Sequence, residues 1–413
     1  MIRYGIVGIG GFAQTWVRSL ALTEERGTAK LSGAVVRNRP KYAEQVAALE
    51  AKGCTIYATL EEMLADGHGK YDVIGVPTGI SYHEPMAVQA LEAGYNVLIE
   101  KPVAGTVQEV ASIAEAERRT GHWCAVGYQH IYSSSLQWLA GKLATGNLGR
   151  IVEGRTMVMW PRAQSYYERN AWAGQLRSND RWTLDGPATN ATAHYMSHMT
   201  YLAQTIEGEE FGVESVRAEL YRAKDIPSYD TSCIEVVTKG GARLYHYVTH
   251  SCVENVNPET VLECERGTAH WDRDSETWTI RYSDGTEESS PSDADSPVHA
   301  GPIAQVARVA AGVDAAPLCG ITQAGPHVLI INLAFESSMG IIPVTSAYTR
   351  QSDHQGSTLL SVEGIEDVIR DAWKKGGLFS DFGVPWAKGT QSVAAKGYTQ
   401  FPRKELGAIL KAD

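Results

Sequence analysis

Short apolar runs alternate with amphipathic stretches through the first 127 residues of the chain. The apolar runs lie at residues 4–7, 31–36, 55–57, 73–76, 97–99 and 124–127. This alternation is typical of a parallel sheet whose strands are joined by helical crossovers. Two local signals support the helices, because residues 59–62 have the sequence of a capping box and Gly53 follows a helical stretch over 40–52. The pattern predicts an α/β domain over residues 1–127.

The pattern changes after residue 127, so residues 128–413 are interpreted as a second domain. A helix is expected near 134–145, and strands are expected at 151–160, 231–238, 243–250 and 277–282. Polar and apolar residues alternate from Arg243 to Val248, which predicts a largely antiparallel sheet with one face less buried. Such a face favours burial against a second subunit, so a homodimer or homotetramer formed through this sheet is expected.

Composition indicates the class of partner. The chain has 413 residues, 43% of them hydrophobic and 21% charged, which fits a globular protein of two or three domains. Its formal net charge of −11 argues against a nucleic acid or an anionic membrane as the main partner. We therefore expect a small-molecule substrate.

Six scattered cysteines form no CxxC pair and show none of the Cys/His spacing of structural zinc sites, so reduced thiols and no metal are expected. The first residues lack the features of a signal peptide, and no run of 18 apolar residues could span a bilayer. These features predict a cytoplasmic protein.

A glycine-rich stretch follows the first predicted strand and opens a helix, as in the G-x-G-x-x-G/A arrangement of dinucleotide sites. Gly8 allows the tight turn, Gly10 lets the backbone approach a pyrophosphate, and Ala13 permits close helix packing. The helix N-terminus then faces the anion. Residues assigned to cofactor binding here are Gly8, Gly10, Gly11, Phe12 and Ala13.

The end of the second strand indicates which dinucleotide is bound. NAD sites normally place Asp or Glu there to accept a hydrogen bond from the ribose 2′-hydroxyl, but this chain has Arg37, Asn38 and Arg39. Two guanidinium groups suit a 2′-phosphate, because arginine forms charge-assisted bonds with phosphate oxygens. We therefore expect NADP as the preferred cofactor, with NAD as the alternative, although one of the two arginines could be an ordinary surface charge.

Two further groups of residues lie at the carboxyl ends of strands, where open α/β sheets bind ligands. Pro77, Thr78 and His83 follow the fourth strand, and Glu100-Lys101-Pro102 follows the fifth. All but Pro102 are assigned to the cofactor site. Lys101 could also pass a proton to or from a hydroxyl during hydride transfer.

With these motifs, the chain resembles the Gfo/Idh/MocA oxidoreductases, relatives of glucose-fructose oxidoreductase and inositol dehydrogenase. The resemblance runs through residues 8–13, 77–83, 100–102 and 126–128 and a helix containing His194. It implies an N-terminal Rossmann domain with a doubly wound parallel sheet and a C-terminal α/β domain with a large open sheet. It also implies NAD(P), sugar or cyclitol substrates, Lys101 as the catalytic lysine, and a nicotinamide site that Glu100 and Pro102 help to shape.

The second catalytic stretch of that family usually reads Asp-x-x-x-His-x-x-Asp, and here both acids are replaced, by Asn190 and Ser197. His194 is retained. Asn190, His194, Ser197 and Tyr201 have the spacing of one helix face, which predicts a polar stripe pointing into a site. The simpler alternative is that His194 is a core histidine bonded to the backbone. Asp185, before Gly186-Pro187, is expected to cap the helix, and the alternative is that it is a displaced catalytic acid.

Aromatic residues with polar groups are dense between residues 160 and 182. Trp and Tyr rings can cover the apolar faces of a sugar while Arg and Asn bind its hydroxyls. Some of these rings must instead belong to the core. Residues assigned to substrate binding are Tyr128, Trp160, Arg162, Tyr167, Trp172, Asn190 and His194.

We therefore predict an NADP-dependent oxidoreductase that transfers hydride between nicotinamide and a secondary alcohol or ketone of a sugar, cyclitol or related polyol. Lys101 would move the proton, with His194 as its partner and Asn190 orienting the substrate or His194. Two alternatives stay open. One is an NAD-dependent enzyme of the same fold that cleaves glycosides by oxidation and elimination. The other is a non-catalytic sensor that binds a dinucleotide.

Overall fold

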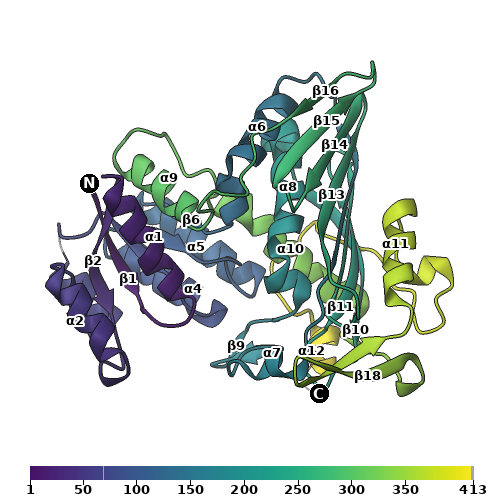
Figure 1. Cartoon of the computed structure of the whole chain (residues 1–413), viewed down its shortest axis with the longest axis horizontal. Coiled ribbons are helices and arrows are strands. Elements are labelled where there is room, and N and C mark those ends of the chain that lie inside the picture. Colours follow the sequence, from purple (N-terminus) through teal and green to yellow (C-terminus); the bar gives the residue numbers. More distant parts are fainter. Residues whose placement is uncertain (68, 411–413) are drawn as a thin grey trace. The chain divides into compact units, whose positions relative to one another are not determined.

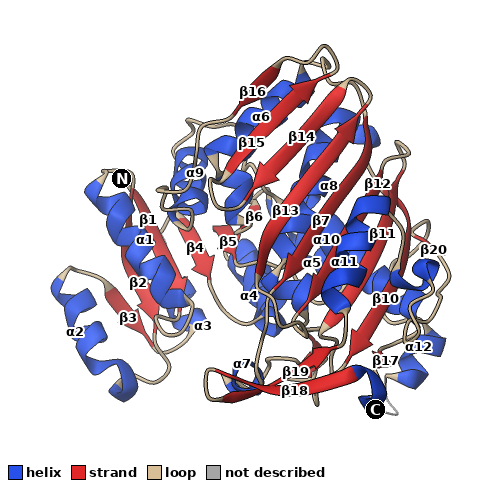
Figure 2. Ribbon diagram, turned by 45° about the vertical axis from the view of Figure 1, so that its right-hand side comes forward, coloured by secondary structure: helices blue, strands red, loops and turns tan. Residues whose placement is uncertain are grey.

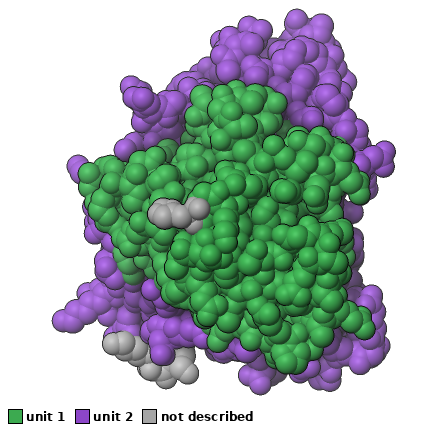
Figure 3. Space-filling model, turned by 90° about the vertical axis from the view of Figure 1, so that its left-hand side faces the viewer, with its two compact units in different colours: residues 1–104, 108–133, 296–325 green, residues 105–107, 134–295, 326–413 purple. Residues whose placement is uncertain are grey.

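A computed structural model describes residues 1–67 and 69–410 of the chain. The chain forms two compact units, which are coloured separately in Figure 3. The first comprises residues 1–104, 108–133 and 296–325, and the second comprises residues 105–107, 134–295 and 326–413. The expected boundary after residue 127 therefore leaves out residues 296–325, which return to the N-terminal unit.

The first unit is built on a six-stranded parallel sheet with the strand order β3-β2-β1-β4-β5-β6. Its strands are β1 (Ile2–Val7), β2 (Ala29–Val35), β3 (Thr55–Tyr57), β4 (Val73–Val76), β5 (Asn96–Ile99) and β6 (Cys124–Val126). Its helices are α1 (Ala13–Glu25), α2 (Ala43–Ala51), α3 (Leu60–Asp66), α4 (Ile80–Glu92), α5 (Val107–Thr120) and α9 (Ala300–Ala310). This order confirms the doubly wound Rossmann sheet. The order reverses between β1 and β4, which is where such sheets bind ligands.

The returning segment packs on the first unit through helix α9. Ile303, Val306 and Ala307 of α9 belong to the same buried cluster as Tyr4 of β1. The Tyr4 hydroxyl also donates to the carbonyl of Ile303 at 2.9 Å. Helix α9 therefore completes the core of a domain whose strands all lie before residue 127.

The second unit is built on a ten-stranded sheet whose main order is β16-β15-β14-β13-β7-β12-β11-β10-β17, with β20 paired to β10. These strands are β7 (Ile151–Met159), β10 (Val213–Arg222), β11 (Thr231–Thr238), β12 (Arg243–Thr249), β13 (Val256–Cys264), β14 (Gly267–Asp272), β15 (Thr277–Tyr282), β16 (Glu287–Ser289), β17 (Ile342–Pro343) and β20 (Val393–Ala394). Pairing is antiparallel except between β7 and β12 and between β10 and β17, which confirms the mostly antiparallel sheet.

Helices and two small hairpins complete this unit (Figures 1 and 2). The helices are α6 (Ser134–Ala144), α7 (Gln164–Glu168), α8 (Ala193–Glu207), α10 (Ile321–Ser338, which begins in the first unit), α11 (Ile365–Lys375) and α12 (Lys404–Ile409). The hairpins pair β8 (Arg177–Ser178) with β9 (Arg181–Trp182) and β18 (Thr349–His354) with β19 (Ser357–Val362).

Strand β12 is covered on both faces, so the expected less buried face is wrong for this strand. Leu244 to Thr249 are all buried. On one face Tyr245 and Tyr247 share a buried cluster with Ile369 of α11, while α8 packs on the other face. The expectation of a second subunit rested on this face, so an oligomer stays a prediction that light scattering can test.

The six cysteines are free thiols, of which five are buried and Cys264 is partly exposed. Within residues 1–67 and 69–410, no helix has the length and apolar character needed to cross a membrane.

Candidate functional site

The glycine loop follows β1 and leads into α1. Gly8 has φ +95° and Gly11 has φ +56°, a backbone region that favours glycine. At Gly10 a Cβ atom would lie 2.1 Å from the Tyr42 hydroxyl, so a larger residue would clash with that ring. The loop therefore needs glycine at these positions for conformation and for space, as close approach to a pyrophosphate requires. Ala13 is buried at the start of α1, and Phe12 is 47% exposed.

The three residues after β2 are all exposed but differ in their contacts. Arg39 donates from Nη2 to the carbonyl of Ile56 at 2.5 Å, and its Nη1 lies 4.0 Å from Glu50 Oε1. Asn38 Oδ1 accepts from the backbone N–H of Lys41 at 3.1 Å. Among the described residues no side chain pairs with the Arg37 guanidinium. Arg37 is therefore better placed than Arg39 to meet a phosphate.

Glu100 is buried at the end of β5 and joins two parts of the first unit. Its Oε1 accepts from Trp16 Nε1 of α1 at 2.8 Å, and its Oε2 accepts from the backbone N–H of Lys101 at 3.1 Å. Burial raises the pKa of Glu100 to about 7, and the charge of Lys101 and the two donors oppose that rise. Trp16 fits because β4 has Gly75 beneath it, where a Cβ would lie 2.8 Å from the indole. Lys101 itself is partly exposed.

His83 is a buried residue of α4 that contacts two neighbouring loops. Its Nδ1 is 2.8 Å from the carbonyl oxygen of Pro102, and its Nε2 is 3.1 Å from that of Thr78. Burial lowers the pKa of His83, although the two carbonyls favour the protonated ring. The side chain therefore ties the loop after β4 to the loop that carries Lys101. Pro77 is buried, Thr78 is partly exposed, and the Tyr128 side chain is fully buried.

In the second unit, Asn190 lies in one turn of π-helix, Pro187–Ala191, that precedes α8. Its Nδ2 donates to Asp185 Oδ1 at 2.9 Å, and Asp185 Oδ2 accepts from the backbone N–H of Gly174 at 2.7 Å. Asp185 is thus a buried partner of Asn190, and the expected helix cap is wrong because Gly186 is the capping residue. A carboxylate therefore remains beside position 190.

Buried side chains from three other elements hold this π turn. The Tyr229 hydroxyl accepts from the backbone N–H of Thr189 at 3.0 Å, and His327 Nε2 lies 3.0 Å from the carbonyl of Ala188. Thr192 Oγ1 is 3.3 Å from Nε2 of His246 on β12. Burial, together with the nearby His327, lowers the pKa of His246 to about 3, so this ring is neutral. π turns of this kind are frequent at functional sites.

The predicted polar stripe is interrupted. Thr192 separates the π turn from α8, so Asn190 does not continue the register of His194 and Ser197. Those two residues are buried on α8, where most side chains from 193 to 203 are buried on all sides. Further along the helix, the Tyr201 hydroxyl accepts from Gln137 Nε2 of α6 at 3.0 Å. Tyr201 thus packs between helices of the unit.

The aromatic residues after β7 form a cluster with arginines and a histidine. The Arg162 guanidinium lies over the rings of Trp160, at 5.3 Å, and Tyr166, at 5.2 Å. Arg169 lies over Tyr166 at 3.7 Å and also over Trp172. The Tyr167 hydroxyl is 3.0 Å from Nδ1 of His250, whose pKa is lowered by burial and by neighbouring cations. Four of the predicted substrate residues therefore lie in one part of the second unit: Trp160, Arg162, Tyr167 and Trp172.

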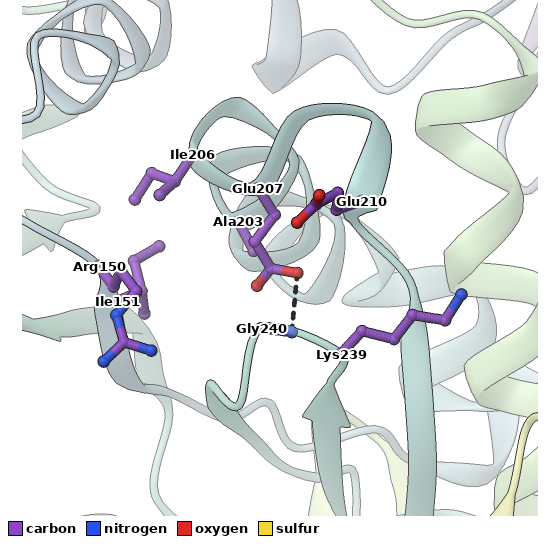
Figure 4. Close-up of a pocket in the computed structure, with 8 residues that line it drawn as sticks. All are labelled: Arg150, Ile151, Ala203, Ile206, Glu207, Glu210, Lys239 and Gly240. Carbon is purple, nitrogen blue, oxygen red and sulfur yellow. Dashed lines mark hydrogen bonds between the residues drawn. The ribbon is translucent and has the colours of Figure 1, made fainter.

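A separate cavity of about 540 Å³ lies where β7 begins and α8 ends (Figure 4). Two of its charged side chains have partners within the protein. Arg150 pairs with Glu265, and Glu207 accepts from Thr238 Oγ1 and from the backbone N–H of Gly240. None of the residues predicted to act lines this cavity.

The first unit matches a known family. Residues 2–128 match the sequence model of an oxidoreductase family with an NAD-binding Rossmann fold, Gfo/Idh/MocA. The resemblance expected from the motifs is thereby confirmed over residues 2–128.

Curated relatives of the chain include inositol dehydrogenases. Inositol 2-dehydrogenase/D-chiro-inositol 3-dehydrogenase of Shouchella clausii is 33% identical over 138 residues, which cover 32% of this chain and 37% of that protein. Inositol 2-dehydrogenase of Azotobacter vinelandii is 25% identical over 59% of this chain and 73% of that protein. The chain spans about a third to about half the length of the first relatives it matches.

Solved structures extend the likeness beyond residues 2–128. The WlbA dehydrogenase of Bordetella pertussis, solved with NADH and UDP-GlcNAcA, is 24% identical with a TM-score of 0.65 over 82% of this chain and 96% of that chain. An NAD-binding oxidoreductase from Klebsiella pneumoniae is 17% identical with a TM-score of 0.66 over 82% and 97%. At these identities the likeness shows that the fold is shared.

Sequence reasoning missed four residues that the structure places beside the predicted ones: Trp16, Tyr42, Asp185 as a partner, and His250. Trp16 carried a weak signal, because a tryptophan one turn into the helix after a glycine loop must find a partner for its N–H. The contacts of Tyr42 and His250 join segments distant in sequence, and no local pattern announces them.

Proposed function

We propose that the chain is an NADP-dependent oxidoreductase that transfers hydride between nicotinamide and a secondary alcohol or ketone of a sugar, cyclitol or related polyol. The observation that carries this proposal is the hydrogen bond from Trp16 to Glu100. It ties the helix that follows the glycine loop to the residue before Lys101, and all three features lie at the carboxyl edge of one parallel sheet. A dinucleotide on that edge would have a proton-transfer group beside it.

The residues of the first unit divide the work. When bound, the nicotinamide supplies or accepts the hydride. Lys101 Nζ takes the hydroxyl proton in the oxidation direction and returns a proton in the reduction direction. Glu100 accepts from the Lys101 backbone N–H and so holds the peptide that carries the lysine. His83 fixes the same loop from its other side through the Pro102 carbonyl.

The preference for NADP rests on the residues after β2. No acid occurs between Ser32 and Pro40, so nothing in that stretch would accept a bond from a 2′-hydroxyl. Arg37 is exposed, and its guanidinium forms no hydrogen bond or ion pair with the described residues. Arg39 donates to the carbonyl of Ile56 and lies near Glu50. A 2′-phosphate would gain a charge-assisted bond from Arg37.

The substrate class rests on the second unit and on the relatives. The aromatic and arginine cluster after β7 offers ring faces and donors to a carbohydrate. In this proposal His194 and Asn190 orient the substrate. The Asn190 amide donates to Asp185, which would leave the amide oxygen directed at a donor of the ligand. The inositol dehydrogenases among the relatives act on a cyclitol, which belongs to the proposed class.

A substrate panel tests the proposal. Purified protein would be mixed with NADP or NAD and with aldoses, inositols, sugar acids or glycosides, and nicotinamide absorbance would be followed. We expect reduction of NADP with at least one polyol. Glycoside cleavage without net change of the nicotinamide would favour the eliminating enzyme instead. Dinucleotide binding without turnover of any compound would favour the sensor.

A further inference from the structure

A cavity of about 600 Å³ opens in the second unit beside the segment that follows β7. Its wall is formed by residues between Pro161 and Tyr166, by Asn255, and by His354 and Gln355 at the turn between β18 and β19. This hairpin lies beside α7 in Figure 2, where the Ser165 backbone N–H donates to Ser357 Oγ at 3.1 Å. Three segments distant in sequence therefore build one wall.

The described residues of this wall include no carboxylate. Arg162 supplies a permanent positive charge, and the remaining polar groups are hydroxyls, two amides and the imidazole of His354. The whole chain carries a net charge of −11, so a cavity lined without acids departs from the average surface. Its lining is suited to an anion.

The Arg162 guanidinium is held in place but is not satisfied. Two rings, Trp160 and Tyr166, lie against it, and its Nη1 donates to the carbonyl of Pro161 at 3.1 Å. Its Nε is buried and finds no hydrogen-bond acceptor among the described residues. The guanidinium charge is therefore met by a backbone carbonyl and two aromatic residues, and by no carboxylate among the described residues.

Several partly buried arginines of this unit have acidic partners, whereas Arg222 donates to the carbonyls of Ile226 and Pro227. Arg155 pairs with Glu263, Arg217 pairs with Asp381, and Arg273 pairs with Glu276. No carboxylate of the described part of the chain forms an ion pair with Arg162. Partly buried guanidinium groups favour an acidic partner, and the described residues supply none to Arg162, so a ligand with an acidic group would fit this place.

We propose that this cavity binds an acidic group of the substrate, a carboxylate or a phosphate, through Arg162. The inference rests on the proposed function in taking the ligand to be the carbohydrate substrate. Arginine meets both kinds of anion with charge-assisted, often bidentate bonds, and its stacking between two rings fixes the plane of the fork. A neutral polyol would leave the charge unmatched. The substrate class is thereby narrowed to sugar acids or sugar phosphates.

Calorimetric titration of the full chain without cofactor tests this directly. The probes are D-glucuronate, D-glucose 6-phosphate and inorganic phosphate, with D-glucose as the neutral control. We expect at least one acidic sugar to bind about ten- to a hundredfold more tightly than glucose, the worth of one charge-assisted contact. The carboxylate and phosphate probes distinguish the two sources of the anion. Equal binding of glucose and both acidic sugars would overturn the proposal.

Two variants and one chemical readout locate the binding. Arg162→Gln should abolish the preference for the acidic probe, whereas Arg169→Gln, which removes the other cation stacked on Tyr166, should keep it. Equal loss in both variants would contradict a specific role for Arg162. In the wild-type protein, the acidic probe should slow phenylglyoxal modification of Arg162 as read by mass spectrometry, and an unchanged rate would also overturn the proposal.

This design separates the inference from the proposed function. Binding is measured without cofactor, so it does not depend on hydride transfer. Anion binding at Arg162 without turnover would refute the oxidoreductase proposal and keep the site. Turnover of neutral polyols that Arg162→Gln does not change would refute the anion site and keep the oxidoreductase proposal.

Discussion

The two units hold their polar groups in different ways. In the first unit, Glu100 and Lys101 directly follow β5, and the carboxylate is held by two donors, one of them Trp16 of α1. In the second unit, Asn190 lies in a π turn whose backbone is held by Tyr229 and His327 from distant parts of the chain. The first arrangement is set by the end of a strand and one contact from α1, whereas the second depends on buried polar contacts from several distant segments.

This difference has a consequence for mutation. A residue at the end of a parallel strand is placed by strand pairing, so its side chain can be changed with little effect on the fold. A π turn is a rare backbone form that persists only where surrounding contacts over-determine it. We therefore expect changes at Lys101 to alter the reaction and changes near Asn190 to alter stability as well.

The largest expected effect is at Lys101. Replacing it by Met should lower kcat by about 10²- to 10⁴-fold, the usual worth of a positioned acid–base group, while dinucleotide affinity stays within about twofold. Steady-state kinetics and calorimetry measure the two quantities. Lys70→Met is the matched control, because that lysine lies in an exposed pair with Asp66. Unchanged turnover in Lys101→Met would remove the lysine from the mechanism.

Cofactor choice should change by about ten- to a hundredfold at Arg37. Arg37→Asp supplies an acceptor for a 2′-hydroxyl and repels a 2′-phosphate, so the variant should prefer NAD. Arg39→Gln should keep most of the NADP preference, because that side chain is already engaged with Ile56. Calorimetric titration with both dinucleotides measures the order. Tighter binding of NAD by the wild-type protein would contradict the assignment.

Substitution of Asn190 in the π turn should lower stability by an amount that depends on pH. Asn190→Asp brings a second carboxylate against Asp185 and removes the donated hydrogen bond, so about 1–3 kcal/mol of unfolding free energy should be lost near neutral pH. The repulsion raises the pKa of the pair, so the loss should shrink as the pH falls and one acid binds a proton. Asn190→Ala is the control, since it loses the bond without adding charge.

Denaturant unfolding at several pH values separates the two variants. The Asn190→Asp loss should depend on pH, and the Asn190→Ala loss should not. Identical pH dependence would mean that the Asp185 carboxylate does not face position 190. Restored or raised activity in Asn190→Asp would indicate instead that the position works as an acid when one is supplied.

The smallest expected effect concerns Glu100. Its pKa is raised to about 7 in the folded protein by burial, above the ordinary value in the unfolded chain. The stability that it contributes is therefore present at low pH and is lost as the pH rises towards about 7. Glu100→Gln should be more stable relative to wild type at about pH 8 than at about pH 5, and Glu25→Gln on the exposed end of α1 should show no such difference. The same relative stability at both pH values would show that Glu100 is charged throughout.

The first unit was predictable from local patterns because each buried parallel strand reads as one apolar run between turns. The expected run at 73–76 is β4 to the residue, and the expected run at 55–57 is β3. The glycine loop and Lys101 followed from their places after such strands. What local patterns could not show is that residues 296–325 return to this unit, since that depends on packing between α9 and β1.

The second unit was less predictable, because its burial and its turns depend on contacts between segments that are distant in sequence. Alternation in β12 indicated an exposed face, but α11, more than a hundred residues later, covers it. The helical spacing of Asn190 and His194 assumed an unbroken α-helix, and the π turn interrupts it. Asp185 was predicted to be a cap from its place before Gly186-Pro187. Its actual partners, Gly174 and Asn190, depend on a fold that the local sequence does not specify.

The most direct test of the account follows a labelled hydrogen. The polyol that reduces NADP in the panel would be prepared with deuterium on the carbon that is oxidised, and the reduced dinucleotide would be analysed by mass spectrometry. We predict that deuterium appears on the nicotinamide ring with the wild-type protein and that Lys101→Met forms the labelled product about 10²- to 10⁴-fold more slowly. Consumption of the polyol with no deuterium on the nicotinamide would contradict the proposed hydride transfer.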